Sequence, residues 1–400
     1  MLDFPDEPTR FWAGPPMSGR RSSGLPRIAL DCRYLGPRPS GIGEVVAALV
    51  RHLPELAPDC EFTFLRNALR EEPLSMASNV RELAVRSPAN GPVTLLHLPL
   101  AVDLTGIELF HAPANILPGG LAMPAITTVH DVMWLTHPKW CNPHPWGHVE
   151  RHFYRHGITR ALAHSALVAT VSEASRDAII RIAPEAAARV VVTRSGVDRD
   201  FAPVARDAAA LARIGVPSGK RYCLVVGQGA PYKNHEGALR AFAHAFSDAR
   251  DIDCVMVRRR GGSGAALERL AASLGLGGRV HLLDAIERPD LVRLYSAAEV
   301  LLHPSLCEGF GNPVAEAMAC GCPVVTSNLS AMPEVAGGAA LLADPRDPGE
   351  LAAQLRRAVE DRSLAADLRR RGLKRAAELD WRAFAAANLD LYRRALAGVA

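Results

Sequence analysis

The 400 residues exceed what one hydrophobic core usually holds, so the length predicts two domains. With 48% hydrophobic and 22% charged residues, the composition is ordinary for a soluble globular protein, and the net charge of +4 is too small to indicate nucleic-acid binding. Eight cysteines without a repeated spacing exclude a disulfide framework and indicate buried, reduced thiols in a cytoplasmic protein.

Residues 1–26 mix prolines, charges and small residues, and we expect them to form a mobile N-terminal tail. They lack the uninterrupted apolar segment of a signal peptide. No later stretch reaches the ~18 apolar residues that a membrane-spanning helix needs. The sequence therefore predicts a soluble protein, and it leaves open a peripheral contact with the inner face of a membrane.

Short runs of aliphatic and β-branched residues follow as predicted strands. In the first half they are residues 27–35, 62–65, 108–112, 125–131 and 167–172. In the second half they are residues 222–229, 253–259, 280–285, 299–305, 322–327 and 339–344. These runs are continuous rather than alternating, which is typical of parallel strands covered on both faces.

Helical stretches such as 236–247, 265–274 and 289–298 separate the predicted strands. This alternation predicts an α/β fold with two Rossmann-like, doubly wound parallel-sheet domains that face a central cleft. Residues 195–220 contain no predicted strand and mark the seam. We expect the N-terminal domain at 27–200, the C-terminal domain at 201–380, and a helix at 381–400 that caps a domain or crosses back to the first one.

After residue 345 the sequence predicts only helices, and they include the basic run "LRRRGLKR" at 368–375. Arginines near the end of a helix interact favourably with the helix dipole. The run is therefore expected to be a solvated helix face.

The stretch "CEGFGNPVAEAMACGCP", residues 307–323, follows a predicted strand and carries two glutamates. Its glycines allow backbone N–H groups to approach a ligand, and the helix that begins near Pro313 directs its positive end at the loop, which suits a phosphate. A carboxylate at Glu316 could accept hydrogen bonds from a sugar diol. Alternatively, Glu316 complements the helix dipole and Glu308 is a surface loop residue.

From Glu308 to Val325 the sequence resembles the Glu-x7-Glu motif of retaining GT-B glycosyltransferases, in particular glycosyltransferase family 4. The resemblance implies an N-terminal acceptor domain and a C-terminal domain for a nucleotide-diphosphate sugar. It implies that Glu316 holds the ribose hydroxyls and that Glu308 holds the transferred sugar. The residues that it places around the donor are Gly309, Phe310, Gly311 and Asn312, with Phe310 and Gly311 beside the diphosphate.

The segment "VVGQGAPYKNHEGALRAF", residues 225–242, resembles a second family motif that includes the strand glycine Gly227. The resemblance places Lys233 at the donor diphosphate, where an ammonium suits oxygens that gain charge as the leaving group departs. Without the surrounding match, Lys233 would be interpreted as a surface lysine. Family members often carry a basic residue where this chain has Gln228 or Tyr232. Fewer cations than usual then neutralise the diphosphate, unless one of the arginines at 258–260 compensates.

His130 and Asp131 end the predicted strand at 125–131. By resemblance, His130 faces the donor sugar across the cleft. It need not be a general base, because in a same-face retaining transfer the departing phosphate can help to deprotonate the acceptor hydroxyl. The alternative is a structural histidine that Asp131 merely orients.

Three further features admit two interpretations each. Gly41 and Gly43 resemble a family turn that approaches donor or acceptor closely, or form an ordinary tight turn. Ser172 is the expected N-cap of a helix, and Arg176 is a weaker candidate for a phosphate contact. The aromatic loop at 137–148 either forms a wall that binds the acceptor or packs as a lid. Its histidines have no metal-ligand pattern. The resemblance implies an enzyme without a metal or a cofactor.

The resemblance implies a retaining transfer of a hexose, with GDP-mannose as the guessed donor, to a hydroxyl of a glycan or lipid-linked acceptor in polysaccharide biosynthesis. A sugar-nucleotide epimerase or hydrolase is one alternative. A non-catalytic nucleotide-sugar binder or scaffold subunit is the other, and only Gln228 and Tyr232 support it.

Overall fold

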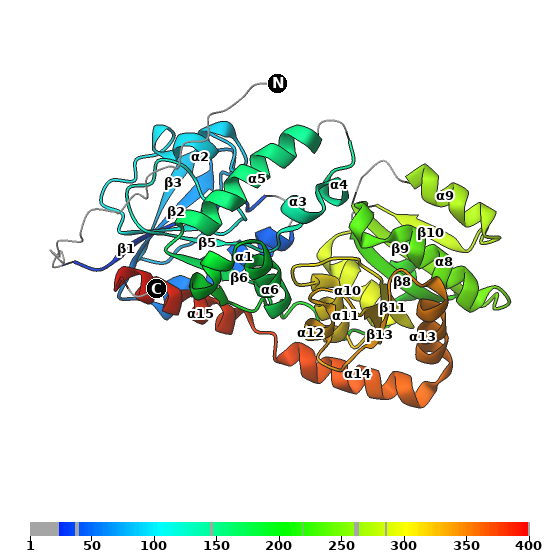
Figure 1. Ribbon diagram of the computed structural model, residues 1–400. Helices are drawn as coiled ribbons and strands as arrows, with labels where there is room; N and C mark the ends of the chain where they lie inside the picture. Colours follow the sequence, from blue (N-terminus) through cyan, green and yellow to red (C-terminus); the bar gives the residue numbers. More distant parts are fainter. Residues whose placement is uncertain are drawn as a thin grey trace, which may run out of the picture.

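The computed structural model describes residues 24–36, 40–144, 147–217, 219–259, 264–284 and 286–398. Almost all of the expected N-terminal tail, residues 1–23, lies outside the described residues. The fold consists of two α/β domains, each built on a parallel sheet with helices on both faces (Figure 1). No helix in the described ranges is long and apolar enough to cross a membrane.

The first domain contains a seven-stranded parallel sheet in the order β3-β2-β1-β4-β5-β6-β7. Its strands are β1 (Arg27–Asp31), β2 (Glu61–Asn67), β3 (Val80–Val85), β4 (Leu109–Ala112), β5 (Ala125–Thr128), β6 (Leu167–Thr170) and β7 (Val190–Val192). Ile28 of β1 pairs with Phe62 on one side and Leu109 on the other. The strand order therefore reverses beside β1, and in such sheets the ligand site lies beyond the strand ends at this point.

Helices cover both faces of this sheet. They are α1 (Gly41–Leu56), α2 (Pro92–His97), η1 (Leu98–Leu100), α3 (Met133–Thr136), α4 (Pro138–Cys141), α5 (Gly147–His164), α6 (Glu173–Ile182) and η2 (Pro184–Arg189). One face of the sheet packs its aliphatic side chains against α1, and the other packs against α5 and α6.

The second domain repeats the plan with six parallel strands in the order β10-β9-β8-β11-β12-β13. Its strands are β8 (Arg221–Gln228), β9 (Ile252–Arg259), β10 (Val280–Leu283), β11 (Val300–His303), β12 (Val324–Ser327) and β13 (Leu341–Ala343). Its helices are α7 (Ala208–Arg213), η3 (Pro231–Lys233), α8 (His235–Phe246), α9 (Gly264–Ser273), α10 (Arg288–Ala297), α11 (Asn312–Ala319), α12 (Met332–Ala336), α13 (Pro348–Glu360) and α14 (Arg362–Ala377). The predicted pair of parallel-sheet Rossmann-like domains is confirmed.

Two strands of the first sheet were not predicted from the sequence. In β3 the exposure of successive residues varies because the strand pairs only with β2 at the edge of the sheet. Its polar side chains break the continuous apolar run on which the other predictions rested. The strand β7 has three residues, too few for a pattern to be recognised.

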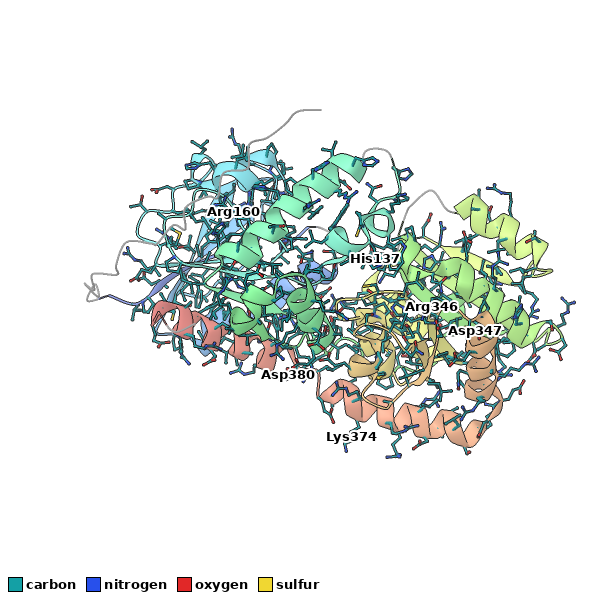
Figure 2. The ribbon with its side chains drawn as sticks, in the orientation of Figure 1. His137, Arg160, Arg346, Asp347, Lys374 and Asp380 are labelled. Atoms are coloured by element: carbon teal, nitrogen blue, oxygen red, sulfur yellow. The ribbon has the colours of Figure 1, made fainter. Side chains whose placement is uncertain are left out.

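The last helix, α15 (Trp381–Leu396), returns to the first domain (Figure 1). Asp380, labelled in Figure 2, begins it by accepting a hydrogen bond from the backbone N–H of Arg382 at 3.1 Å. The helix packs on α1, and the hydroxyl of Tyr392 lies 2.6 Å from His111 Nδ1 beneath the sheet. The C-terminal helix is thus part of the first domain's core.

The basic run at 368–375 is more than a solvated helix face, which corrects the prediction. Arg369 donates to the carbonyl of Gly321 at 2.7 Å, just after the end of α11. Arg375 donates to the carbonyls of Glu334 at 2.9 Å and Val335 at 3.1 Å in the last turn of α12. Carbonyls at a helix C-terminus lack intrahelical donors, so these arginines attach α14 to both helices.

Candidate active site

The loop between β11 and α11 carries the motif of residues 307–323 to the edge of the second sheet. Gly311 adopts φ 104° immediately before α11, a left-handed conformation that favours glycine. Pro313 occupies the first turn of the helix, where its missing N–H costs no hydrogen bond. The eight-residue helix α11 therefore directs its free N–H groups toward the loop.

Glu308 is surrounded by hydrogen-bond donors. Lys233 Nζ lies 2.6 Å from Oε1 of Glu308, the Ser305 hydroxyl donates to the same oxygen at 2.7 Å, and His303 Nε2 lies 3.1 Å from it. Burial raises the pKa of Glu308, but Lys233 and His303 outweigh this effect and hold the pKa at about 2. The carboxylate is therefore ionised throughout the physiological range.

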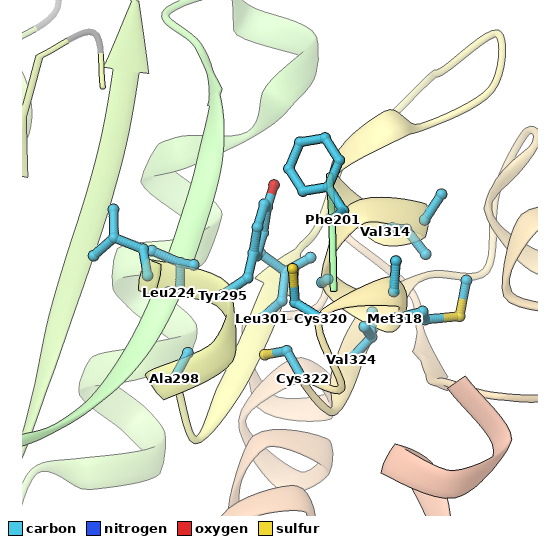
Figure 3. Packing of buried hydrophobic residues seen from close by; sticks show 14 of the residues in the cluster. Phe201, Leu224, Tyr295, Ala298, Leu301, Val314, Met318, Cys320, Cys322 and Val324 are labelled. Atoms are coloured by element: carbon cyan, nitrogen blue, oxygen red, sulfur yellow. The ribbon is translucent and has the colours of Figure 1, made fainter. Parts of the chain in front are cut away.

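Glu316 lies on the second turn of α11 and has fewer donors. The hydroxyl of Tyr295 donates to Oε2 of Glu316 at 2.8 Å. Figure 3 shows Tyr295 beside Phe201, and their ring centroids are 6.1 Å apart. Burial raises the pKa of Glu316 to about 7, with Tyr295 opposing the shift and Glu44 adding to it.

Little free volume lies beside Glu316. The cavity there measures about 10 Å³ and is lined by residues of both domains, including Glu44, Asp198 and Asn312. Such a volume holds no more than about one water molecule. No group larger than a water molecule therefore fits beside Glu316 in this arrangement of the lining residues.

His130 follows β5 in the first domain, and its ring is almost fully buried. Its Nε2 lies 2.8 Å from the carbonyl of Pro113, and a carbonyl can only accept, so Nε2 carries the hydrogen. Burial lowers the pKa of His130, which favours the neutral ring. Among the described residues, no hydrogen bond joins Asp131 to this ring, and its Oδ1 accepts instead from the backbone N–H of Met133 at 2.9 Å.

The two domains meet where His130 touches the glutamate loop. A Cβ at Gly309 would lie 2.4 Å from the carbonyl oxygen of His130, so only glycine fits there. The Ser172 hydroxyl donates to the carbonyl of Gly309 at 2.6 Å, and the Ser175 hydroxyl donates to that of His130 at 2.8 Å. Ser172 also caps α6 as predicted, by accepting from Ser175 N at 3.1 Å.

Two further polar contacts join the domains. Glu334 of α12 accepts hydrogen bonds from the backbone N–H of Glu173 at 2.8 Å and of Ala174 at 3.3 Å, so the second domain caps the N-terminus of α6. Arg288 of α10 bonds Glu44 of α1 at 2.5 Å. Arg176 pairs with its neighbour Glu173 at the surface rather than at the glutamate loop.

Lys233 reaches Glu308 past a glycine. A Cβ at Gly227 would lie 3.3 Å from Lys233 Cδ, so a larger residue would crowd the lysine side chain. Gln228 Nε2 donates to the Tyr232 hydroxyl at 2.7 Å, which shows that the two residues that depart from the family pattern pair with each other. Arg258 is buried, and Arg260 lies outside the described residues.

The remaining predicted residues border the same region. Gly41, the first residue of α1, faces Asn312, since a Cβ at Gly41 would lie 3.7 Å from Asn312 Nδ2. Ser40 caps α1 by accepting from Gly43 N at 3.0 Å. Phe310 packs its ring into the core of the second domain. Apart from Phe310, the structure therefore brings the predicted residues of both domains near the facing sheet edges, and their roles stay predictions.

The aromatic loop at 137–148 is described except for residues 145 and 146. His137 stacks on Trp140 with ring centroids 4.0 Å apart, and α4 contacts η3 of the other domain. These contacts are compatible with both an acceptor wall and a packed lid.

Several residues of this region were not identified from the sequence. His303 and Ser305 contact Glu308, Tyr295 contacts Glu316, and Ser175 and Glu334 join the domains. The only sequence signal was the proximity of His303 and Ser305 to Glu308 within "HPSLCE".

In the described part of the chain, no group of three or more His, Cys, Asp or Glu side chains could hold a metal ion.

Comparisons with known proteins identify the family and the fold. A sequence model of the family "Glycosyl transferases group 1" matches residues 208–375. The O-antigen chain mannosyltransferase B of Escherichia coli is 32% identical over 288 residues, which are 71% of this chain and 74% of the relative. The D-inositol 3-phosphate glycosyltransferase of Kineococcus radiotolerans is 29% identical over 94% of this chain and 97% of its own length.

Among solved structures, sucrose-phosphate synthase from Thermosynechococcus elongatus superposes with a TM-score of 0.72 at 22% identity. The match covers 93% of this chain and 99% of that one, and it confirms the predicted GT-B fold. The motif around Glu308 lies inside the region that the family model matches. This chain therefore belongs to the group 1 glycosyltransferase family.

Proposed function

We propose that this glycosyltransferase moves mannose from a nucleotide-diphosphate sugar to a hydroxyl of a glycan or lipid-linked acceptor, with retention of the anomeric configuration. The observation that carries the proposal is the pair of glutamates at the N-terminus of α11, with Lys233 2.6 Å from the first of them. In the proposed complex, Glu308 binds the sugar and Glu316 binds the ribose. The diphosphate lies between them, at Lys233 and the N-terminal N–H groups of α11.

The charges at the site suit a departing nucleoside diphosphate. Lys233 and the positive end of α11 stabilise negative charge, which grows on the phosphate as the glycosidic bond breaks. Burial lowers the pKa of His130 in the facing domain. In the proposed complex its neutral ring lies beside the transferred sugar and contributes no positive charge. We propose that the departing phosphate takes the proton of the acceptor hydroxyl and that no metal ion takes part.

Mannose as the transferred sugar rests on the relatives. The Escherichia coli relative is named a mannosyltransferase, whereas the Kineococcus radiotolerans relative is named for an inositol phosphate acceptor. We therefore propose GDP-mannose as the donor and polysaccharide synthesis as the role. All eight cysteines are free thiols, which supports a cytoplasmic location.

The experiment that tests the proposal is a thermal unfolding titration of wild type and Glu316→Ala with GDP, UDP, dTDP and ADP. A nucleotide at about 100 times its dissociation constant adds about 2.7 kcal/mol to the free energy of unfolding. We expect GDP to raise the Tm of the wild type by several degrees and to leave that of Glu316→Ala unchanged. An equal shift in both proteins would contradict the assignment of Glu316 to the ribose.

Turnover then separates transferase from binder. With GDP-mannose and a mannose-containing acceptor, a transferase releases GDP in proportion to the product formed. Saturable binding without release of GDP would instead support the scaffold alternative. Release without an acceptor, at the same rate, would support a hydrolase.

A further inference from the structure

The hydrogen bonds on Glu308 are distributed unequally between its two oxygens. Lys233 at 2.6 Å, Ser305 at 2.7 Å and His303 at 3.1 Å all contact Oε1. The backbone N–H of Glu308 donates to the Ser330 hydroxyl at 2.9 Å, which fixes the main chain at the same point. Within the described ranges, no hydrogen bond is made to Oε2.

His303 and Ser305 are well placed to hold this arrangement. His303 is the last residue of β11 and only 2% exposed. Ser305 is fully buried, and its hydroxyl lies 3.1 Å from His303 Nε2 as well as 2.7 Å from Glu308. His303 ends a central strand and Ser305 follows it by two residues, so both side chains are held more precisely than on a free loop.

One hydroxyl hydrogen on Ser305 can go to either neighbour. When the His303 ring donates through Nε2, the serine donates to Glu308. When Nε2 carries a lone pair, the serine donates to the ring instead. A lone pair at Nε2 would face the ionised Oε1 of Glu308 only 3.1 Å away, so the geometry favours the form in which His303 and Ser305 both donate to Oε1.

We infer that His303 and Ser305 are positioning residues for the donor sugar: with Lys233 they occupy Oε1 of Glu308 and thereby reserve Oε2 for a hydroxyl of the transferred sugar. The inference rests on the proposed function. It adds that recognition of the sugar depends on two residues that do not touch it. Recognition of the nucleotide, through Glu316 and the N-terminus of α11, does not depend on them.

The test compares Ser305→Ala, His303→Ala and His303→Gln, with binding of GDP, binding of GDP-mannose and the kinetics of transfer measured separately. A hydrogen bond to a charged group contributes about 1.5–3 kcal/mol, or about 10–150-fold. We expect kcat/KM for GDP-mannose to fall by about that factor in both alanine variants. The Kd for GDP, which lacks the sugar, should change by less than about twofold. Gln keeps an N–H donor for Oε1, so His303→Gln should recover most of the loss.

Ser327→Ala is the matched control. Ser327 is a fully buried serine at the end of the neighbouring strand β12, and its hydroxyl accepts from Leu329 N at 2.9 Å rather than contacting Glu308. It should leave binding of both ligands unchanged. A parallel loss of GDP and GDP-mannose affinity in Ser305→Ala and His303→Ala, or wild-type kinetics in both, would overturn the inference. Failure of the wild type to bind any nucleotide would overturn the proposed function and this inference with it.

Discussion

Glu308 and Glu316 belong to one short motif, but the structure surrounds them differently. Glu308 meets Lys233 of η3 after β8, together with His303 at the end of β11 and Ser305 just beyond it, and its pKa falls to about 2. Glu316 meets one tyrosine hydroxyl, and its pKa rises to about 7. Burial acts on both carboxyl groups in the same direction, so the difference comes from the cations within reach.

Under the proposed function, this difference separates two tasks. The environment of Glu308 is complete before any ligand arrives, which suits a group that must orient a sugar accurately. Glu316 lacks such a partner because the nearby Arg288 is engaged by Glu44 and Asp198. Buried beside a single hydroxyl donor, this carboxyl group is poorly solvated, and under the proposed function a ribose diol would supply the missing donors.

Of the substitutions around these two glutamates, removing Lys233 should lower the free energy of unfolding the most. Lys233→Met leaves the Glu308 charge buried without its cation, and breaking such a pair costs about 3–5 kcal/mol. We expect the free energy of unfolding at pH 7, measured by denaturant titration, to fall by about that amount. Lys374→Met, at an exposed lysine labelled in Figure 2, should change it by less than about 0.5 kcal/mol.

The double variant Lys233→Met, Glu308→Gln tests the cause. It removes the unpaired charge together with the cation, so it should be more stable than Lys233→Met alone. A double variant that is less stable than the single one would show that Lys233 acts through packing rather than through charge.

The pH dependence of stability should distinguish the two glutamates. The pKa of Glu316 rises from 4.5 to about 7 on folding, so the folded state binds more protons and stability falls as pH rises from about 4.5 through 7. The pKa of Glu308 falls from 4.5 to about 2, so its contribution is present above about 4.5 and is lost as pH falls through 2.

Glu316→Gln should therefore raise the free energy of unfolding at pH 8 relative to pH 5. One pKa unit corresponds to about 1.4 kcal/mol, and partial exposure of the side chain limits the gain to no more than about 3 kcal/mol. Denaturant titrations at both pH values measure it. If the free energy of unfolding changes between pH 5 and pH 8 by the same amount in Glu316→Gln as in the wild type, Glu316 titrates normally.

The smallest effect is expected for Tyr295→Phe, which removes the only hydroxyl bonded to Glu316 in the described part of the chain. We expect a loss of about 1 kcal/mol in stability and a further rise in the pKa of Glu316. Tyr222→Phe removes a buried hydroxyl that donates to the carbonyl of Leu294 at 2.8 Å, without contact to Glu316. Plotted against pH, the free energy of unfolding should follow the higher pKa of Glu316 in Tyr295→Phe. In Tyr222→Phe the curve should keep the shape of the wild-type curve.

Much of the fold was predictable because each sheet strand is buried on both faces. Continuous aliphatic runs such as 125–131 and 299–305 then identify the strands, and the turns after them hold His130 and Glu308. The edge strand β3 escaped prediction because solvent allows polar side chains in it. The arginines of α14 were misinterpreted because a charged residue looks the same in sequence whether it meets water or a helix end.

The sequence by itself determined the two α/β domains, the family and the spacing of the two glutamates, because all of these depend on short-range patterns. Only the tertiary structure decided that Lys233 meets Glu308 across 75 positions and that Glu334 caps a helix 161 positions away. The same holds for the return of α15 to the first domain. Contacts between distant loops form where parallel strands end together, and the ionisation of each glutamate follows from those contacts rather than from its neighbours in sequence.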